Sequence, residues 1–183
     1  LSLFPPWAAI DIVYTPRFDA DRFISGRRFS FWNDAAGGRT GEAMPVNADV
    51  PDDWFADDEI AIRVSRNVGS KELALYGYSG YWKSPAGSDP LTGKASFPGL
   101  RVAGASARGQ LGPGILNVEG GWYDSDDDRD GDDPFVRNSE IRLMAGYQFE
   151  AARNLSAAFQ AYLEHMLDHD AYETTLPEGI RRA

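Results

Sequence analysis

The feature that most constrains this chain is a regular alternation of tight turns with long loops. Short turns at 66–70, 109–114 and 151–154 each separate two runs in which apolar and polar residues alternate. Between those paired runs the connections are long and weakly patterned, with many Asp, Gly and Pro residues, and they cover 16–58, 83–98, 124–139 and 168–183. Period-two alternation is typical of strands. The sequence therefore predicts an all-β antiparallel meander with turns at one end and long loops at the other.

The clearest predicted strand covers 141–150, where Ile, Leu, Ala, Tyr and Phe alternate with Arg, Met, Gly, Gln and Glu. The segment 155–163 repeats the pattern, although its alanines and leucines make a helix the rival interpretation. The remaining predicted strands cover 9–14, 59–65, 72–82, 100–108 and 116–123. Alternation is weaker in 72–82 and 100–108, so the sequence does not determine which of their side chains lie on which face of the sheet. These segments make about seven strands of about ten residues each, the length that a tilted strand needs to cross a bilayer.

The two predicted faces of the strands differ in chemistry. One face carries aliphatic residues, with Tyr14, Trp82, Trp122 and Tyr147 toward the strand ends, where aromatic rings settle at lipid headgroups. The other face carries charges of both signs, which is typical of a water-filled pore. The alternative is a soluble β-sandwich, in which the apolar face is the core and the charged face is solvated.

Composition narrows the classes of protein further. At 183 residues the chain is one predicted domain, 1–183, and it has no cysteine for a disulfide framework or a thiolate metal site. A net charge of -10 disfavours nucleic acid as a partner. No apolar run reaches ~18 residues, so a helical span is not expected. The mean hydropathy of -0.41 is compatible with membrane strands, since only every second residue meets lipid.

The segments 141–150 (IRLMAGYQFE) and 116–123 (LNVEGGWY) resemble strands of Gram-negative outer-membrane porins and export channels, the alginate-export type among them. The resemblance implies a cofactor-free β-barrel in the bacterial outer membrane, in contact with the bilayer and lipopolysaccharide, that passes hydrophilic, anionic or sugar-like solutes. Bacterial barrels use an even number of strands, so about seven predict an incomplete segment of a larger barrel, unless a further strand lies in 1–6.

Two other functions compete with a channel. One is a soluble or surface-attached carbohydrate-binding module that uses Trp82, Trp122 and Tyr123. The other is a structural or adhesive barrel with a plugged lumen. An enzyme is not expected, because the sequence holds no Gly-x-Ser-x-Gly elbow and its carboxylates are scattered.

The first long loop interleaves arginines with phenylalanines, so it can bury apolar surface while it presents guanidinium groups. We expect it to fold inward and line a constriction that selects anionic or sugar-like solutes. The alternative is an extracellular flap in which Asp19 and Asp21 pair with these arginines. The predicted pore-lining residues are Arg17, Arg22, Arg27, Arg28, Arg63, Arg101, Glu119, Arg142, Gln148 and Glu164.

The acidic loop 124–139 offers a metal hypothesis. Its segment 126–131 matches the first half of a calcium loop, but Arg137 stands where the bidentate glutamate belongs, so an EF-hand is not supported. A looser calcium site would use Asp124, Asp126, Asp128 and Asp130; the alternative is a solvated loop bridged to lipopolysaccharide phosphates by divalent cations. His165 and His169 lie four apart at the end of the last strand, where a transition-metal site is not expected.

Overall fold

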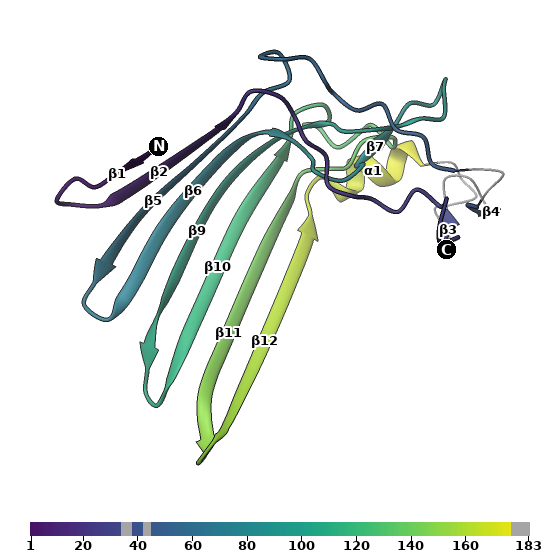
Figure 1. Cartoon of the computed structure of the whole chain (residues 1–183). Helices are drawn as coiled ribbons and strands as arrows, with labels where there is room; N and C mark the ends of the chain where they lie inside the picture. The colour runs from purple at the N-terminus through teal and green to yellow at the C-terminus, as the bar shows by residue number, and fades with distance from the viewer. Residues whose placement is uncertain (34–37, 42–44, 177–183) are drawn as a thin grey trace.

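The computed structural model describes residues 1–33, 38–41 and 45–176. Its main sheet is antiparallel throughout and has the strand order β1-β2-β5-β6-β9-β10-β11-β12 (Figure 1). The strands are β1 (Ser2–Leu3), β2 (Ala9–Thr15), β5 (Glu59–Val68), β6 (Lys71–Tyr81), β9 (Gly99–Leu111), β10 (Gly114–Ser125), β11 (Glu140–Ala152) and β12 (Leu155–Met166). The predicted all-β meander is confirmed. The sheet is open, with β1 and β12 at its edges.

The strand count differs by one from the prediction. Seven strands of the sheet match the predicted segments, and β1 is an additional two-residue strand within 1–6 that pairs Ser2 with Asp11 and Leu3 with Ile10 of β2. The rival helix at 155–163 does not form. Instead β12 pairs with β11 from Leu155 to Met166, because a ladder along the whole strand outweighs a weak intrinsic preference for helix.

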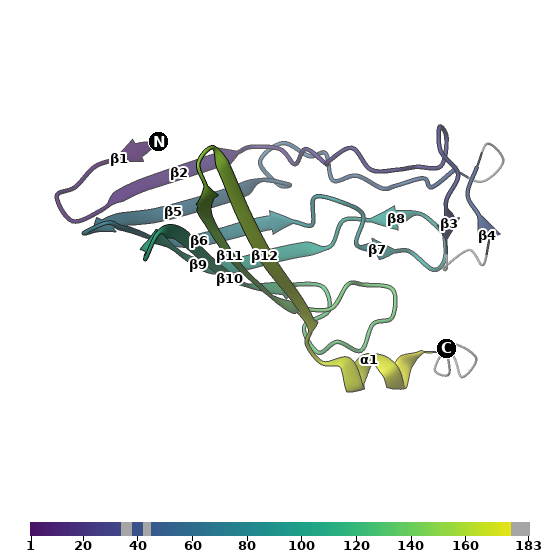
Figure 2. The ribbon, with the colours of Figure 1, turned by 90° about the horizontal axis from the view of Figure 1, so that it is seen from below.

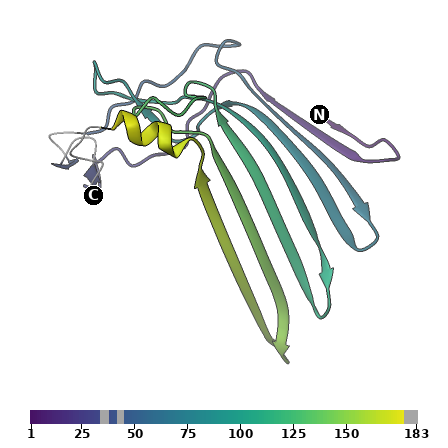
Figure 3. The same cartoon turned by 180° about the vertical axis from the view of Figure 1, so that it is seen from behind.

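Tight turns join the long strands in pairs at one end of the sheet, as predicted (Figures 1 and 3). Each turn holds one residue with a left-handed backbone: Gly69 at φ 63°, Gly112 at φ 58° and Asn154 at φ 63°. Glycine and asparagine tolerate this conformation better than other residues do. Local sequence therefore sets where each of these three hairpins reverses.

The loop end carries more secondary structure than predicted. Within 16–58, β3 (Trp32–Asn33) pairs with β4 (Gly38–Arg39), and within 83–98, β7 (Gly87–Ser88) pairs with β8 (Ala95–Ser96). The segment 168–183 was predicted to be a loop, and this is wrong for its first part, where α1 (His169–Thr175) begins with the Tyr172 amide donating to the Asp168 carbonyl at 3.1 Å. Residues 177–183 lie outside the described part. No described helix is long and apolar enough to cross a membrane.

The buried apolar side chains gather at the loop end of the sheet. Phe18, Trp82, Phe97 and Leu100 are each at most 6% exposed, and the Phe18 ring lies 5.2 Å from the rings of both Tyr81 and Phe97. Figure 2 shows the loops and α1 collected beyond that end of the strands. Across the described strands, the only other buried apolar residue is Ala74. The middle of the sheet is thus a single layer, with both faces open.

Candidate functional site: two opposite faces and a loop layer

One face of the sheet is apolar along most of the length of the strands. Register places Val118 of β10 between Ala107 of β9 and Ala145 of β11, and side chains in phase with Val118 form this apolar face. Its larger members include Ile10, Ile12, Ile60, Ile62, Val64, Leu73, Leu75, Leu116, Val118, Ile141, Leu143, Phe159 and Leu163. Several are strongly exposed, Leu75 by 61% and Phe159 by 68%. The sheet therefore presents to its surroundings a face that has the composition of a protein core.

Aromatic and charged residues mark the two ends of the apolar face. Tyr14, Tyr81 and Trp122 lie toward the loops, and Tyr147 lies toward the turns. The charged members of this face are also near its ends: Arg66 and Lys71 toward the turns, and Arg101 and Asp124 toward the loops. Between these ends, no charged side chain of the described strands lies on the face. The result is an uncharged band bordered by rings and charges.

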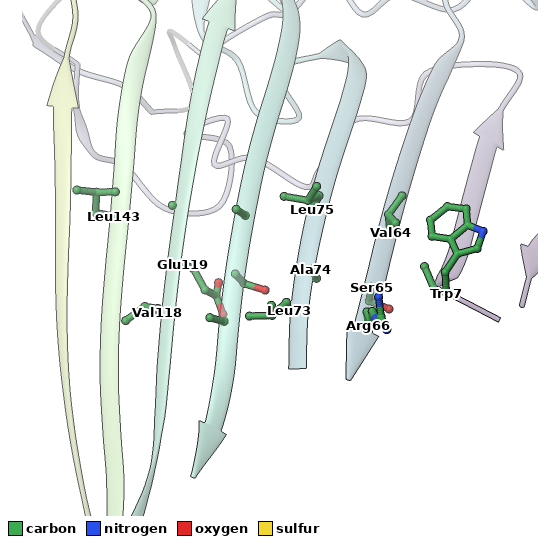
Figure 4. A pocket seen from close by; sticks show the side chains of 15 residues that line it. Trp7, Val64, Ser65, Arg66, Leu73, Ala74, Leu75, Val118, Glu119 and Leu143 are labelled. Carbon is green, nitrogen blue, oxygen red and sulfur yellow. The ribbon is translucent and has the colours of Figure 1, made fainter. Parts of the chain in front are cut away.

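A shallow hollow of about 710 Å³ lies on the apolar face (Figure 4). Trp7, Val64, Leu75 and Leu143 rise around it, while Ala105, Ala107 and Gly120 are among its other lining residues. The hollow forms because small side chains at the centre of the sheet are flanked by leucines. It is therefore part of the apolar face and not a separate binding site.

The opposite face is polar and gathers most of the sheet residues predicted to line a pore. Register puts Arg63, Glu119, Arg142, Gln148 and Glu164 in phase with one another on this polar face. Ion pairs run across its strands: the Arg63 guanidinium contacts Glu72 and lies 3.7 Å from Asp11.

Two predicted positions lie on the other side from the one expected. Arg101 pairs in register with Ser79 and Asp124 at the loop end of the apolar face, and its guanidinium lies 3.0 Å from Asp126. Trp82, predicted on the apolar face, instead follows β6 on the polar side and is 6% exposed. In both segments the alternation of apolar and polar residues was too weak to fix the facing, which the neighbouring strands decide.

Trp82 belongs to a cluster at the loop end of the polar face. The Arg137 and Arg142 guanidinium groups lie 4.7 and 5.7 Å from its ring centre, and the Tyr123 ring stacks on it at 6.0 Å. Glu140, only 4% exposed, accepts from both arginines. The sequence analysis missed Glu140 and gave Arg137 no role. Glu140 could have been found, because residues 140 and 142 are two apart on β11 and therefore lie on the same face.

This arrangement does not assemble the aromatic platform predicted for a carbohydrate module. Trp82 is enclosed by two arginines, and Trp122 lies on the opposite face from Tyr123. A sugar ring stacks on an open aromatic face, which Trp82 does not offer. The three rings therefore do not meet in one binding surface.

An ion pair between a partly exposed lysine and a buried carboxylate attaches the first loop to the sheet. The Lys83 ammonium lies 2.7 Å from Oε2 of Glu59, a carboxylate that is 5% exposed and also accepts from the Tyr78 hydroxyl at 2.5 Å. The same ammonium donates to the Asp19 carbonyl at 2.9 Å and lies 4.7 Å from the centre of the Phe18 ring. Residues far apart in sequence thus anchor the start of 16–58 over the strand ends.

Three of the first-loop arginines surround a second hollow. Arg22, Arg27 and Arg28 line a volume of about 840 Å³ together with Phe29 and Val50; we call it the arginine hollow. Within the described part of the chain, none of the three forms an ion pair, whereas Arg17 lies 3.8 Å from Asp52. The predicted pairing of these arginines with Asp19 and Asp21 does not form there. The hollow therefore gathers three arginines beside a single lining acid, Asp21, in an acidic protein.

The four aspartates of the predicted calcium site have separate environments. Asp124 and Asp126 both contact Arg129, Asp128 is 4% exposed, and Asp130 is exposed to solvent. The structure does not bring three of them within mutual reach of one ion. In the described ranges, the one group of His, Asp or Glu side chains that meets this condition is His169, Asp170 and Glu173 on α1, all exposed. His165 lies apart from that group, at the end of β12.

Comparison of the chain with protein-family models, with curated proteins and with solved structures finds no match.

Proposed function

We propose that this chain is part of an outer-membrane β-barrel channel whose apolar face meets lipid and whose polar face lines a water-filled lumen. The observation that supports this most is the uncharged band of the apolar face, bordered by Tyr14, Tyr81 and Trp122 on one side and by Arg66 and Lys71 on the other. Amphipathic rings and charges prefer the two interfaces of a bilayer, and aliphatic side chains prefer its centre.

The exposure of that face argues against a protein that functions in water. Soluble monomers rarely leave contiguous apolar patches larger than a few hundred Å² uncovered. In a sandwich, a second layer would cover Leu75, Val118 and Leu143, yet these side chains are 61%, 38% and 47% exposed. The main apolar cluster of the described residues lies at the loop end instead. Lipid is the partner whose chemistry fits this face.

The eighth strand of the sheet, β1, has only two residues and is too short to cross a bilayer, so closure of the barrel needs further strands. Among the described strands, β12 forms an edge of twelve residues with no partner on one side, and the opposite edge is the two-residue β1. An unpaired backbone group in hydrocarbon costs several kcal/mol. We therefore place this sheet within a larger barrel, as an incomplete segment to which further strands add along the edges.

The charged residues of the polar face and of the arginine hollow indicate which solutes the proposed channel would pass. A polar face with both signs suits hydrophilic solutes in general, and the arginine hollow at the loop end suits anionic or sugar-like ones, because guanidinium groups bind carboxylates and hydroxyls through directed hydrogen bonds. Arg17, Arg22, Arg27 and Arg28 would act at the entrance, and Arg63, Glu119, Arg142, Gln148 and Glu164 along the wall. Passage of this kind needs no cofactor.

One observation favours a second candidate, a barrel closed by its own loops. The Phe18 and Phe97 rings pack together at the strand ends, Leu100 is also buried, and Lys83 donates to the Asp19 carbonyl of the first loop. A loop layer held this firmly is suited to a plugged structural or adhesive protein. Single-channel conductance separates the two candidates, since a plugged barrel passes no steady current.

The location is tested on the full-length parent protein, extracted from cell envelopes and run on a detergent gel with and without boiling. A closed barrel in the outer-membrane fraction migrates faster before boiling. Recovery from the soluble fraction with unchanged mobility would contradict the proposal.

A further inference from the structure

The acidic loop encloses three buried side-chain oxygens that have no hydrogen-bond partner among the described residues. They are Oγ of Ser125, Oδ2 of Asp128 and Oδ1 of Asn138. These side chains are 0%, 4% and 2% exposed, which makes them among the most buried in the molecule. Polar groups this deeply buried are almost always hydrogen-bonded in folded proteins. Their coincidence within one short loop therefore calls for a ligand.

Hydrogen bonds hold the three residues in the same small region. The Asp128 amide donates to the Ser125 carbonyl at 3.3 Å, and the Ser125 amide donates to the hydroxyl of Ser139, the neighbour of Asn138, at 3.0 Å. The Asn138 amide nitrogen donates to the carbonyls of Gly131 and Leu167 at 3.4 and 3.2 Å. Since its nitrogen is committed to those two carbonyls, its oxygen points away from them.

The carboxylate of Asp128 is fixed in the same way. Its Oδ1 accepts from the amides of Asp132 and Asp133 at 3.0 and 3.2 Å, which leaves Oδ2 free. The nearby arginines are occupied. Arg129 contacts Asp124 and Asp126, and Arg137 contacts Glu140 and Glu164. No basic side chain of the described chain pairs with Asp128.

A buried carboxylate without a cation is electrostatically unfavourable. Each buried oxygen left unpaired costs about 1–3 kcal/mol, and an unpaired buried charge costs more. Burial raises the pKa of Asp128, although the hydrogen bonds that its carboxylate accepts from the Asp133 and Asp132 amides act in the opposite direction. A positive ion among the three oxygens would remove all of these penalties together.

We propose that the loop 124–139 holds a hard divalent cation, Ca²⁺ by preference, with Asp128 Oδ2, Asn138 Oδ1 and Ser125 Oγ as its side-chain ligands. Carboxylate and amide carbonyl oxygens are the ligands that Ca²⁺ takes, and its flexible geometry suits an irregular loop better than the strict octahedron of Mg²⁺ does. The site has one formal charge, so its Kd is expected on the order of 10⁻⁴–10⁻³ M, as in extracellular calcium modules. This ligand set shares only Asp128 with the four aspartates predicted from sequence, and it is independent of the proposed channel.

The test measures binding of Tb³⁺ by its sensitised luminescence, followed by competition with Ca²⁺, on the full chain in detergent. Tyr123 lies two residues from Ser125 and serves as the sensitiser. Asp128→Asn keeps the shape of the side chain and its Oδ1 acceptor but removes the charge, and we expect Ca²⁺ affinity to fall about tenfold or more. Asp130→Asn makes the same change on an exposed neighbour and should leave affinity within about twofold.

Three outcomes would overturn the inference. Equal losses in both variants would show a diffuse ion atmosphere around an acidic loop. Unchanged binding in Asp128→Asn would place the ion elsewhere. Absence of Ca²⁺ competition at about 10 mM would show that ordered water satisfies these oxygens.

A second variant keeps the test decisive if Asp128→Asn fails to fold. Asn138→Asp adds a negative charge at a proposed ligand and removes the two hydrogen bonds that its amide nitrogen donates to Gly131 and Leu167. With a cation site, the variant binds Ca²⁺ more tightly, by about tenfold, and its unfolding temperature rises with added Ca²⁺. With a hydrated pocket, the variant is destabilised to the same extent with and without Ca²⁺, which would refute the proposal.

Discussion

An arginine placed at Val118 separates lipid from water as the surroundings of the apolar face. Val118 lies four residues from Gly114 at the turn end of β10 and four from Trp122 toward the loops. At a rise of ~3.4 Å per residue and a tilt of ~45°, it sits about 9–10 Å inside the interface that Trp122 marks. That depth is near the midplane of the hydrocarbon layer.

The expected cost of Val118→Arg in a bilayer is about 2–4 kcal/mol, the penalty for arginine at the midplane of a membrane barrel. This corresponds to a roughly 30- to 700-fold change in the folding equilibrium. In water the same substitution is cheap, because Val118 is 38% exposed and no layer covers it. Changes at such surface positions stay within about 0.5 kcal/mol.

The matched control is Glu119→Arg, the adjacent residue on the polar face. It should change stability by less than about 0.5 kcal/mol in either environment while it shifts the ion selectivity of the channel toward anions. Stability is measured by reversible urea unfolding from phospholipid vesicles, with tryptophan fluorescence as the signal. Equal, small effects of the two variants would refute the assignment of the apolar face to lipid.

Three further predictions concern the loop end. Lys83→Met leaves a buried carboxylate without its cation and should lower the free energy of unfolding in urea by about 1–3 kcal/mol. Arg17→Met breaks a solvent-exposed pair and should lower it by under about 0.5 kcal/mol, so similar losses in the two variants would contradict the anchoring role of Lys83. Gly131→Ala places a Cβ 2.6 Å from two side-chain atoms, so it should cost more than Gly93→Ala, which has a similar φ but open space around it, and equal thermal shifts would exclude a steric effect. Because the folded-state pKa of Asp128 is raised, its contribution to stability is present below the ordinary Asp pKa and is lost as pH rises through the raised value. Unfolding temperatures measured against pH should show this loss in the presence of a chelator but not in the presence of Ca²⁺. Identical pH profiles in the two conditions would contradict the cation site.

Local sequence determined the strands, their turns and the chemistry of most faces. Alternation in 141–150 placed Leu143 and Arg142 on opposite faces, since side chains of neighbouring residues in a strand must point to opposite sides. Gly69, Gly112 and Asn154 marked the reversals because few other residues accept a left-handed backbone there. Both effects act within a few residues, so a single sequence is enough to predict them.

Tertiary structure alone decided the facing of weakly patterned segments. Between 99 and 111 most side chains are small, and only register with β6 and β10 shows that Arg101 lies on the apolar face. The same holds for Trp82 at the end of β6. Where side chains do not differ in polarity, the face is selected by register with the neighbouring strands and by the geometry of the connecting turns.

The loop layer depended on contacts between residues distant in sequence. Lys83 meets Glu59 and Phe18, and Asn138 reaches the carbonyl of Leu167. The buried position of Asp128 among exposed aspartates is likewise invisible in the run 126–130, where every acid appears equivalent. Burial and pairing arise from how separate loops pack on one another, so sequence determined the composition of the acidic loop and only the folded chain decided which of its oxygens are enclosed.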